Sequence, residues 1–206
     1  MKIAIIGVGN IGGTLAKAWL KSGHKILLGV RDLESDGVQG LLSLSEGVSA
    51  KPIYEAAQEA EVILIAVPSA AVFEVVKNMG YVADKVIIDA MNSVGKKPEP
   101  FANTTEAIRH HTRCRHLVKC FNSTGWENIA NPMYGDTAID MFMAGSSEKG
   151  KQVAAQLSKE AGFAECYDIG GDDKVQLLED FALFWINLAI MQRQGRNIAF
   201  KLLRRP

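Results

Sequence analysis

The first thirty residues constrain the fold of this chain more than any other segment. Residues 2–6 (KIAII) are typical of a buried strand, and residues 7–12 follow with the pattern G-x-G-x-x-G. An amphipathic stretch comes next, and residues 25–29 form a second apolar run. A strand, a glycine turn, a helix and a second strand in this order are typical of a dinucleotide-binding unit.

Each glycine of the pattern has its own mechanical role in this interpretation. Gly7 allows a tight turn after the first strand, Gly9 lets the backbone approach a pyrophosphate, and Gly12 lets the helix pack closely on the strand. The helix N-terminus adds free N–H groups and a partial positive charge. The alternative is a turn that needs glycine for packing alone. We expect the pyrophosphate site to consist of Gly7, Val8, Gly9, Asn10, Ile11 and Gly12.

The end of the second strand predicts which dinucleotide is bound. Spacing alone would select Asp32 for the ribose hydroxyls of NAD, but the apolar run ends at Gly29, which places Val30 at the strand tip. Val30 cannot bind a diol, whereas Arg31 can pair with a 2′-phosphate. The sequence therefore favours NADP(H), with a solvated Arg31–Asp32 pair as the alternative.

The order of apolar segments predicts an α/β fold, because strands and helices alternate along the 206 residues. The predicted architecture is a Rossmann-type, doubly wound, mostly parallel sheet with a small C-terminal helical portion. We expect strands at residues 2–6, 25–29, 48–50, 61–67, 85–89, 116–120, 140–144 and 165–169. We expect helices at residues 11–22, 53–59, 70–78, 103–113, 148–161 and 174–193.

We expect two parts in the chain: an NADP-binding Rossmann domain at residues 1–145 and a C-terminal α/β extension at residues 146–206. Residues 174–193 are apolar nearly all round, which indicates burial on more than one side. Because one small sheet covers only one side of this helix, we expect its other side to pair with a second subunit in a homodimer. We also expect the helix to line the substrate pocket. A helix buried wholly within its own chain is the alternative.

Composition narrows the possible partners. A formal net charge of zero gives no basis for a nucleic-acid or anionic-membrane partner. The N-terminus has a strand pattern rather than a signal peptide, and the longest apolar stretch, 181–191, is too short to span a bilayer. Three cysteines without C-x-x-C spacing favour a reducing, cytoplasmic location. No metal is expected, because nearby arginines oppose a cation at the one cluster of possible ligands, His110, His111, Cys114 and His116.

Three further loops are expected at strand ends, where ligands bind in parallel sheets. We expect them to form the pocket for the reactive end of the dinucleotide, although their residue types are also common in turns. No Ser-His-Asp order appears, and no proton donor stands out for carbonyl reduction. That pattern favours hydride transfer to a flavin-like ring. The loop residues are Ala66, Val67, Pro68, Met91, Asn92 and Asn122.

These motifs resemble those of the deazaflavin-dependent NADP oxidoreductases and of the related cytosolic domain of membrane ferric reductases. The resemblance covers essentially the whole chain and implies a dimer with NADPH at the glycine turn. It also implies a ring acceptor, coenzyme F420, FMN or FAD, near Pro68, Asn122 and the last helix, with Asn122 orienting the ring. Val30 departs from the Ser or Thr that often precedes the arginine, and Asn122 matches the ferric-reductase branch where some deazaflavin enzymes have His. The matching motifs are residues 7–12, 29–31, 66–68, 88–92 and 118–122.

Two other functions remain open at this point. One is an imine reductase of the pyrroline-carboxylate type, which shares a similar glycine turn but usually carries a longer helical C-terminal domain. The other is an NADPH-sensing protein that binds the cofactor without turnover.

Overall fold

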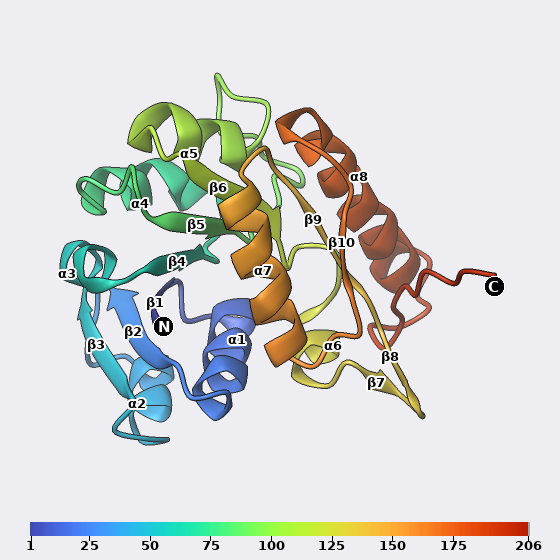
Figure 1. The fold of residues 1–206 in the computed structure, drawn as a ribbon, viewed down its shortest axis with the longest axis horizontal. Coiled ribbons are helices and arrows are strands. Elements are labelled where there is room, and N and C mark those ends of the chain that lie inside the picture. The colour runs from blue at the N-terminus through green and yellow to red at the C-terminus, as the bar shows by residue number, and fades with distance from the viewer. Residues whose placement is uncertain (206) are drawn as a thin grey trace.

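A computed structural model describes residues 1–205 (Figure 1). Its strands are β1 Lys2–Ile6, β2 Lys25–Val30, β3 Val48–Pro52, β4 Val62–Ile65, β5 Val86–Asp89, β6 His116–Cys120, β7 Met133–Tyr134, β8 Thr137–Ala138, β9 Met141–Ala144 and β10 Cys166–Asp168. Its α-helices are α1 Asn10–Lys21, α2 Asp36–Leu42, α3 Ile53–Glu59, α4 Val72–Asn78, α5 Thr104–Thr112, α6 Trp126–Ala130, α7 Glu148–Glu160 and α8 Val175–Ile186. Two 3-10 turns, Ser69–Ala71 and Asp172–Lys174, precede α4 and α8, and a π-helical turn, Asn187–Met191, extends α8.

One eight-stranded sheet organises the molecule, in the order β10-β9-β6-β5-β4-β1-β2-β3. The strands from β3 to β6 are parallel and follow the order 3-2-1-4-5-6 of a doubly wound nucleotide-binding sheet. β9 runs antiparallel to β6 and carries β10 beside it in parallel, so two reversed strands extend one edge. The predicted Rossmann-type, mostly parallel sheet is confirmed.

The predicted elements are all present, with ends within two residues of those expected when the π-helical turn is counted with α8. Two short helices and one hairpin escaped prediction. α2 spans seven residues and contains Gly37 and Gly40, which lower helix propensity. α6 has five residues and the strands of the β7–β8 hairpin have two each, so neither shows a full period of hydrophobicity.

Helices cover both faces of the sheet because alternate strand residues point to opposite sides. Ile3 and Ile5 of β1 pack in the cluster that includes α1, α2 and α7, whereas Ala4 and Ile6 pack in the cluster that includes α3, α4 and α5. The fully buried Trp19 links α1 to α7, since its Nε1–H donates to the carbonyl of Leu157 at 2.9 Å. This hydrogen bond joins two helices that cover the same face of the sheet.

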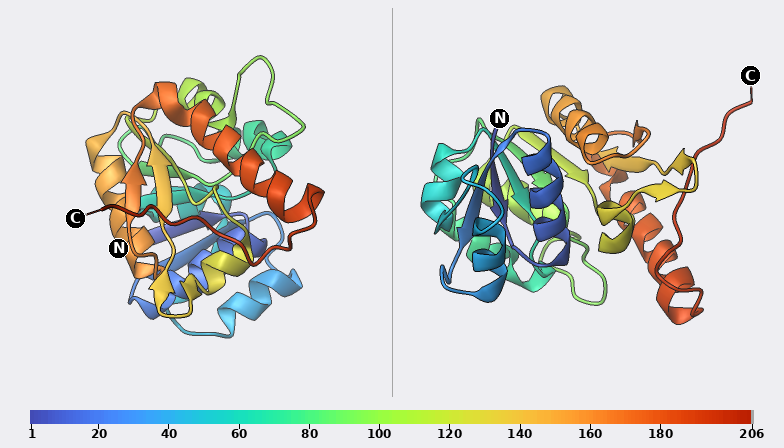
Figure 2. Two further views of the ribbon diagram at one scale, coloured as in Figure 1. Left: turned by 90° about the vertical axis from the view of Figure 1, so that its right-hand side faces the viewer. Right: turned by 90° about the horizontal axis from the view of Figure 1, so that it is seen from below.

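The C-terminal segment lies beside the β9–β10 edge, where α8 packs on β9 (Figure 2). The last residues run back along α8 (Figure 2). Trp185 Nε1 donates to the carbonyl of Ile198 at 2.6 Å, and the Phe200 ring lies 4.7 Å from that of Phe181. Strands from both sides of residue 145 belong to one sheet. The division into 1–145 and 146–206 stays a prediction.

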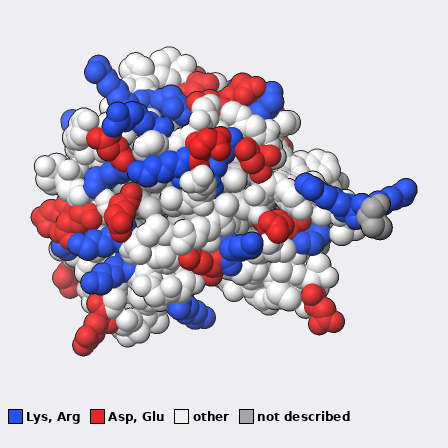
Figure 3. Space-filling model, in the orientation of Figure 1, with Lys and Arg blue, Asp and Glu red and all other residues white. Residues whose placement is uncertain are grey.

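One side of the last helix is exposed in the single chain, although the sequence is apolar nearly all round. Its buried side is formed by Val175, Leu178, Ala182 and Trp185, while Leu177, Leu183, Phe184, Ile190 and Met191 are exposed. On the face drawn in Figure 3, acidic and basic side chains are intermixed rather than gathered in a broad area of one sign. Within residues 1–205 no helix combines the length and the apolar character that crossing a membrane requires.

Candidate dinucleotide site

The glycine turn between β1 and α1 lies where the strand order reverses, between β1 and β4. Gly7 has φ of +102°, and a Cβ atom there would lie 2.4 Å from the carbonyl oxygen of Ala66. A Cβ on Gly12 would lie 1.9 Å from the carbonyl oxygen of Gly7. The fold itself therefore requires glycine at both positions, in the turn and packing roles expected of them.

Gly9 differs from its two neighbours, because a Cβ atom there would meet nothing within 4 Å. Packing does not require a glycine at this position, and its bare backbone is open. Gly9 is also the N-cap of α1; it offers no side-chain cap, and the first turn of α1 has no acidic residue. In contrast, Asn103 caps α5 by accepting from the N–H of Glu106. Open backbone and an uncapped helix N-terminus together fit a pyrophosphate.

Two adjoining pockets flank the turn. The first, of about 320 Å³, lies between the end of β2 and the start of α4. It is lined by Ile6, Gly7, Val8, Gly29, Val30, Arg31, Asp32, Ser35, Ile53, Val67, Pro68, Ala71, Glu74 and Val75. The second, of about 340 Å³, includes Val8, Gly9, Asn10 and the exposed Lys17. The first pocket is at the small end of the range for ligand sites and suits one nucleoside half of a dinucleotide.

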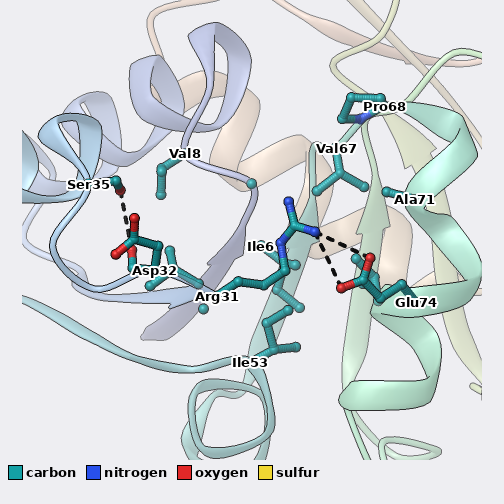
Figure 4. A pocket seen from close by; sticks show the side chains of 14 residues that line it. Ile6, Val8, Arg31, Asp32, Ser35, Ile53, Val67, Pro68, Ala71 and Glu74 are labelled. Atoms are coloured by element: carbon teal, nitrogen blue, oxygen red, sulfur yellow. Dashed lines mark hydrogen bonds and ion pairs between the residues drawn. The ribbon is translucent and has the colours of Figure 1, made fainter.

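Arg31 extends across the first pocket and meets Glu74 of α4 (Figure 4). Its Nη1 lies 3.3 and 3.4 Å from the two carboxylate oxygens of Glu74. Asp32 lies on the opposite side, and its carboxylate accepts from the N–H of Glu34 at 2.9 Å. The guanidinium is thus placed inside the pocket, while Asp32 is held in its own turn.

A pair of amides stands at the ends of β5 and β6. Asn122 Nδ2 donates to Asn92 Oδ1 at 2.9 Å, and Asn92 Nδ2 donates to the backbone carbonyl of Asn122 at 2.8 Å. Asn122 is 4% exposed, and its Oδ1 has no hydrogen-bond partner among the described residues. A buried acceptor without a donor fits an amide N–H supplied by a ligand, such as the carboxamide of nicotinamide.

The backbone that carries Asn122 is strained. Phe121 has φ of +63°, a left-handed conformation that is uncommon for a bulky residue. Its ring is fully buried and packs edge-on against Trp19 at 5.6 Å between centroids. Packing of this kind can hold a strained backbone, and strain of this kind clusters at functional sites.

The structure brings most of the predicted site residues together, in three groups. Gly7, Val8, Val30, Arg31, Val67 and Pro68 line the first pocket, Val8, Gly9 and Asn10 line the second, and Asn92 pairs with Asn122. Ile11 and Gly12 lie in the first turn of α1, and Ala66 abuts Gly7. Met91 differs: its side chain is buried in the core on the α4–α5 face and its N–H donates to Asp89, so only its backbone carbonyl is left for a ligand there.

Sequence reasoning missed a buried ionic cluster beside these loops. Lys119 of β6 places Nζ 3.1 Å from Asp89 Oδ2 and 2.7 Å from Glu179 Oε1, and all three residues are buried. The hydroxyls of Thr104 and Thr105 also donate to Asp89. The sequence did contain a signal of this cluster: Lys119 and Glu179 are charged residues inside an apolar strand and an apolar helix, and such residues need buried partners.

The side chains of the histidine and cysteine cluster make contacts within the chain. The rings of His110 and His111 pack against Phe101, and the Cys114 thiol donates to the carbonyl of Lys85. Across residues 1–205, no group of three or more His, Cys, Asp or Glu side chains is arranged to hold a metal ion.

Comparison with known proteins gives one family match and several similar structures. Residues 2–93 match the family model described as NADP oxidoreductase, coenzyme F420-dependent. A protein of Arthrobacter sp. FB24, provisionally described as an F420-dependent NADP reductase, is 24% identical, with a TM-score of 0.87 over 99% of this chain and 100% of its own. The hypothetical protein SMa0349 of Sinorhizobium meliloti is 23% identical, with a TM-score of 0.69 over 100% of this chain and 96% of its own.

A reductive aminase of Aspergillus terreus, solved with NADPH, has the same fold over part of its length. It is 18% identical, with a TM-score of 0.69 over 93% of this chain and 62% of its own. At these identities the likeness establishes the fold, whereas the family match covers the segment with the glycine turn and Arg31. Over residues 2–93 this chain is similar to the coenzyme F420-dependent NADP oxidoreductase family.

Proposed function

We propose that the protein is an NADP(H)-dependent oxidoreductase that exchanges a hydride with a flavin or deazaflavin: coenzyme F420, FMN or FAD. The observation that carries this proposal is the open Gly9 backbone at an uncapped helix N-terminus, beside a pocket that contains Arg31. Gly7 to Gly12 would hold the pyrophosphate and Arg31 the 2′-phosphate. Ala66, Val67, Pro68, Asn92 and the Met91 backbone would border the ribose and nicotinamide.

The bound dinucleotide would supply a hydride to the acceptor ring, with the accompanying proton taken from water. The residues of this chain would bind and orient. Asn122 Oδ1 would accept an amide N–H, and the paired amide of Asn92 would keep Asn122 in place. The paired side chains of Asn92 and Asn122 are amides, which do not act as acids, and ring-to-ring transfer requires orientation and exclusion of water rather than a proton donor. This supports a ring acceptor over a carbonyl.

We also propose a homodimer formed through the exposed side of α8, which leaves five large apolar side chains in solvent in the single chain. The three free cysteines support a reducing location such as the cytoplasm.

The test follows the NADPH absorbance of the purified protein with coenzyme F420, FMN, FAD and a cyclic imine added separately. Oxidation with one of the rings supports the proposal and identifies the acceptor. Oxidation with the imine alone would overturn it in favour of an imine reductase. Tight NADPH binding with no oxidation by any acceptor would overturn it in favour of a sensor. The Asn122→Ala variant should lower kcat by about tenfold or more while NADPH still binds, because the residue orients rather than anchors.

A further inference from the structure

The first pocket contains one cation and two carboxylates. Its charged lining residues are Arg31, Asp32 and Glu74, with a formal sum of −1. Asp32 is engaged in its own turn, since its carboxylate accepts from the N–H of Glu34. Within residues 1–205, the side chain of Glu74 makes its hydrogen bonds to Arg31 alone. Of the two carboxylates, that of Glu74 is therefore the one directed at the guanidinium that a 2′-phosphate would need.

The ion pair between Arg31 and Glu74 is easily broken. The two side chains are 75% and 50% exposed, and exposed ion pairs contribute little to stability. Glu74 lies in the first turn of α4, across the pocket from the end of β2, so its carboxylate remains close when Arg31 turns to another anion. A phosphate at Arg31 would then experience the negative charge of Glu74, whereas a ribose hydroxyl would not be repelled.

We propose that Glu74 is a specificity-determining residue of the dinucleotide pocket, a role that rests on the proposed function. Its carboxylate competes with the 2′-phosphate of NADP(H) for Arg31 and can accept from the ribose hydroxyls of NAD(H), as the acidic residue after the second strand does in NAD sites. Glu74 thereby reduces the preference for NADP(H). The apolar Val30 acts in the same direction, because it offers the phosphate no hydroxyl.

The test compares dissociation constants for NADPH and NADH, measured by fluorescence titration at low salt. We expect Glu74→Gln to bind NADPH about three- to tenfold more tightly than the unaltered protein, while NADH binds equally or more weakly. The matched control Glu46→Gln removes the same charge from an exposed loop outside the pocket and should leave the ratio of the two constants unchanged. Circular dichroism checks that both variants fold.

A double-mutant cycle separates the proposed competition from a general charge effect. An Arg31→Ala variant has no guanidinium for which Glu74 and the phosphate could compete. In that background, Glu74→Gln should improve NADPH affinity less than it does in the unaltered protein, so the two substitutions should be non-additive. An unaltered NADPH-to-NADH ratio in Glu74→Gln, with both dinucleotides still bound, would overturn the role of Glu74 and leave the proposed function standing. Failure of the unaltered protein to bind either dinucleotide would overturn both.

Discussion

The ammonium group of Lys119 lies 2.7 Å from the Glu179 carboxylate, and neither side chain is more than 5% exposed. Asp89 completes the cluster at 3.1 Å, and the N–H of Ser93 donates to Glu179 at 3.1 Å. These contacts tie together β5, β6 and α8. They also fix the loop that carries Asn92, so the amide pair depends on an ionic cluster that water does not reach.

Replacing Lys119 with Met should destabilise the protein strongly, because two buried carboxylates would face each other without a cation. Breaking a buried ion pair by removing one partner costs about 3–5 kcal/mol. Urea denaturation measures the change in the free energy of unfolding. The control Lys77→Met, at an exposed position on α4, should change it by less than about 0.5 kcal/mol. Equal free energies of unfolding for the two variants would show that the charge of Lys119 is not needed for stability.

Local patterns explain how much of this molecule could be predicted from sequence. The β1 strand, the glycine turn and α1 follow from adjacent residues, so their positions and the role of Gly12 could be read directly. The contacts of Lys119 depend on which strands are neighbours, since Asp89 is 30 residues away and Glu179 is 60. Sequence spacing gives no rule for partners at that separation.

The same limit applies to the dinucleotide pocket. Arg31 could be identified from the end of a strand, but Glu74 is 43 residues away on a helix that meets it only in the folded sheet. The antiparallel direction of β9 likewise had no local signal, because a strand has the same pattern in either direction.

Gly9→Ala and Gly12→Ala should separate ligand binding from folding. A methyl group on Gly9 meets no protein atom within 4 Å, so the free energy of unfolding should fall by no more than about 1 kcal/mol, the cost of alanine at a helix N-cap. NADPH binding should weaken by about tenfold or more, because the methyl group occupies the approach of the pyrophosphate. Fluorescence titration and urea denaturation measure the two effects.

Gly12→Ala is the structural counterpart of that variant. Its Cβ would lie 1.9 Å from the Gly7 carbonyl oxygen, so the helix must shift, and we expect a loss of about 1–3 kcal/mol or more. Unchanged NADPH affinity in Gly9→Ala would remove the main support for the pyrophosphate site.

Leu177 and Met191 lie on one stripe of the last helix, 56% and 71% exposed, with Phe184 between them. If this stripe forms the proposed dimer, the mass in solution should be twice the 22.4 kDa of one chain. The double variant Leu177→Glu, Met191→Glu should be monomeric, because buried unpaired carboxylates oppose association. Light scattering after size exclusion measures both masses. Tyr81→Glu, at an aromatic residue that is 74% exposed away from α8, should keep the mass of the unaltered protein. A monomeric unaltered protein would exclude the dimer.

The three thiols should differ sharply in reactivity. Burial raises the pKa of the Cys114 thiol, and burial together with the neighbouring Cys166 raises that of Cys120, so both stay protonated at mildly alkaline pH, where a free thiol begins to ionise. Cys166 is only partly buried. Iodoacetamide should therefore add one group to the native protein and three to the urea-unfolded protein, as counted by mass spectrometry, and the native Cys166→Ser variant should remain unmodified.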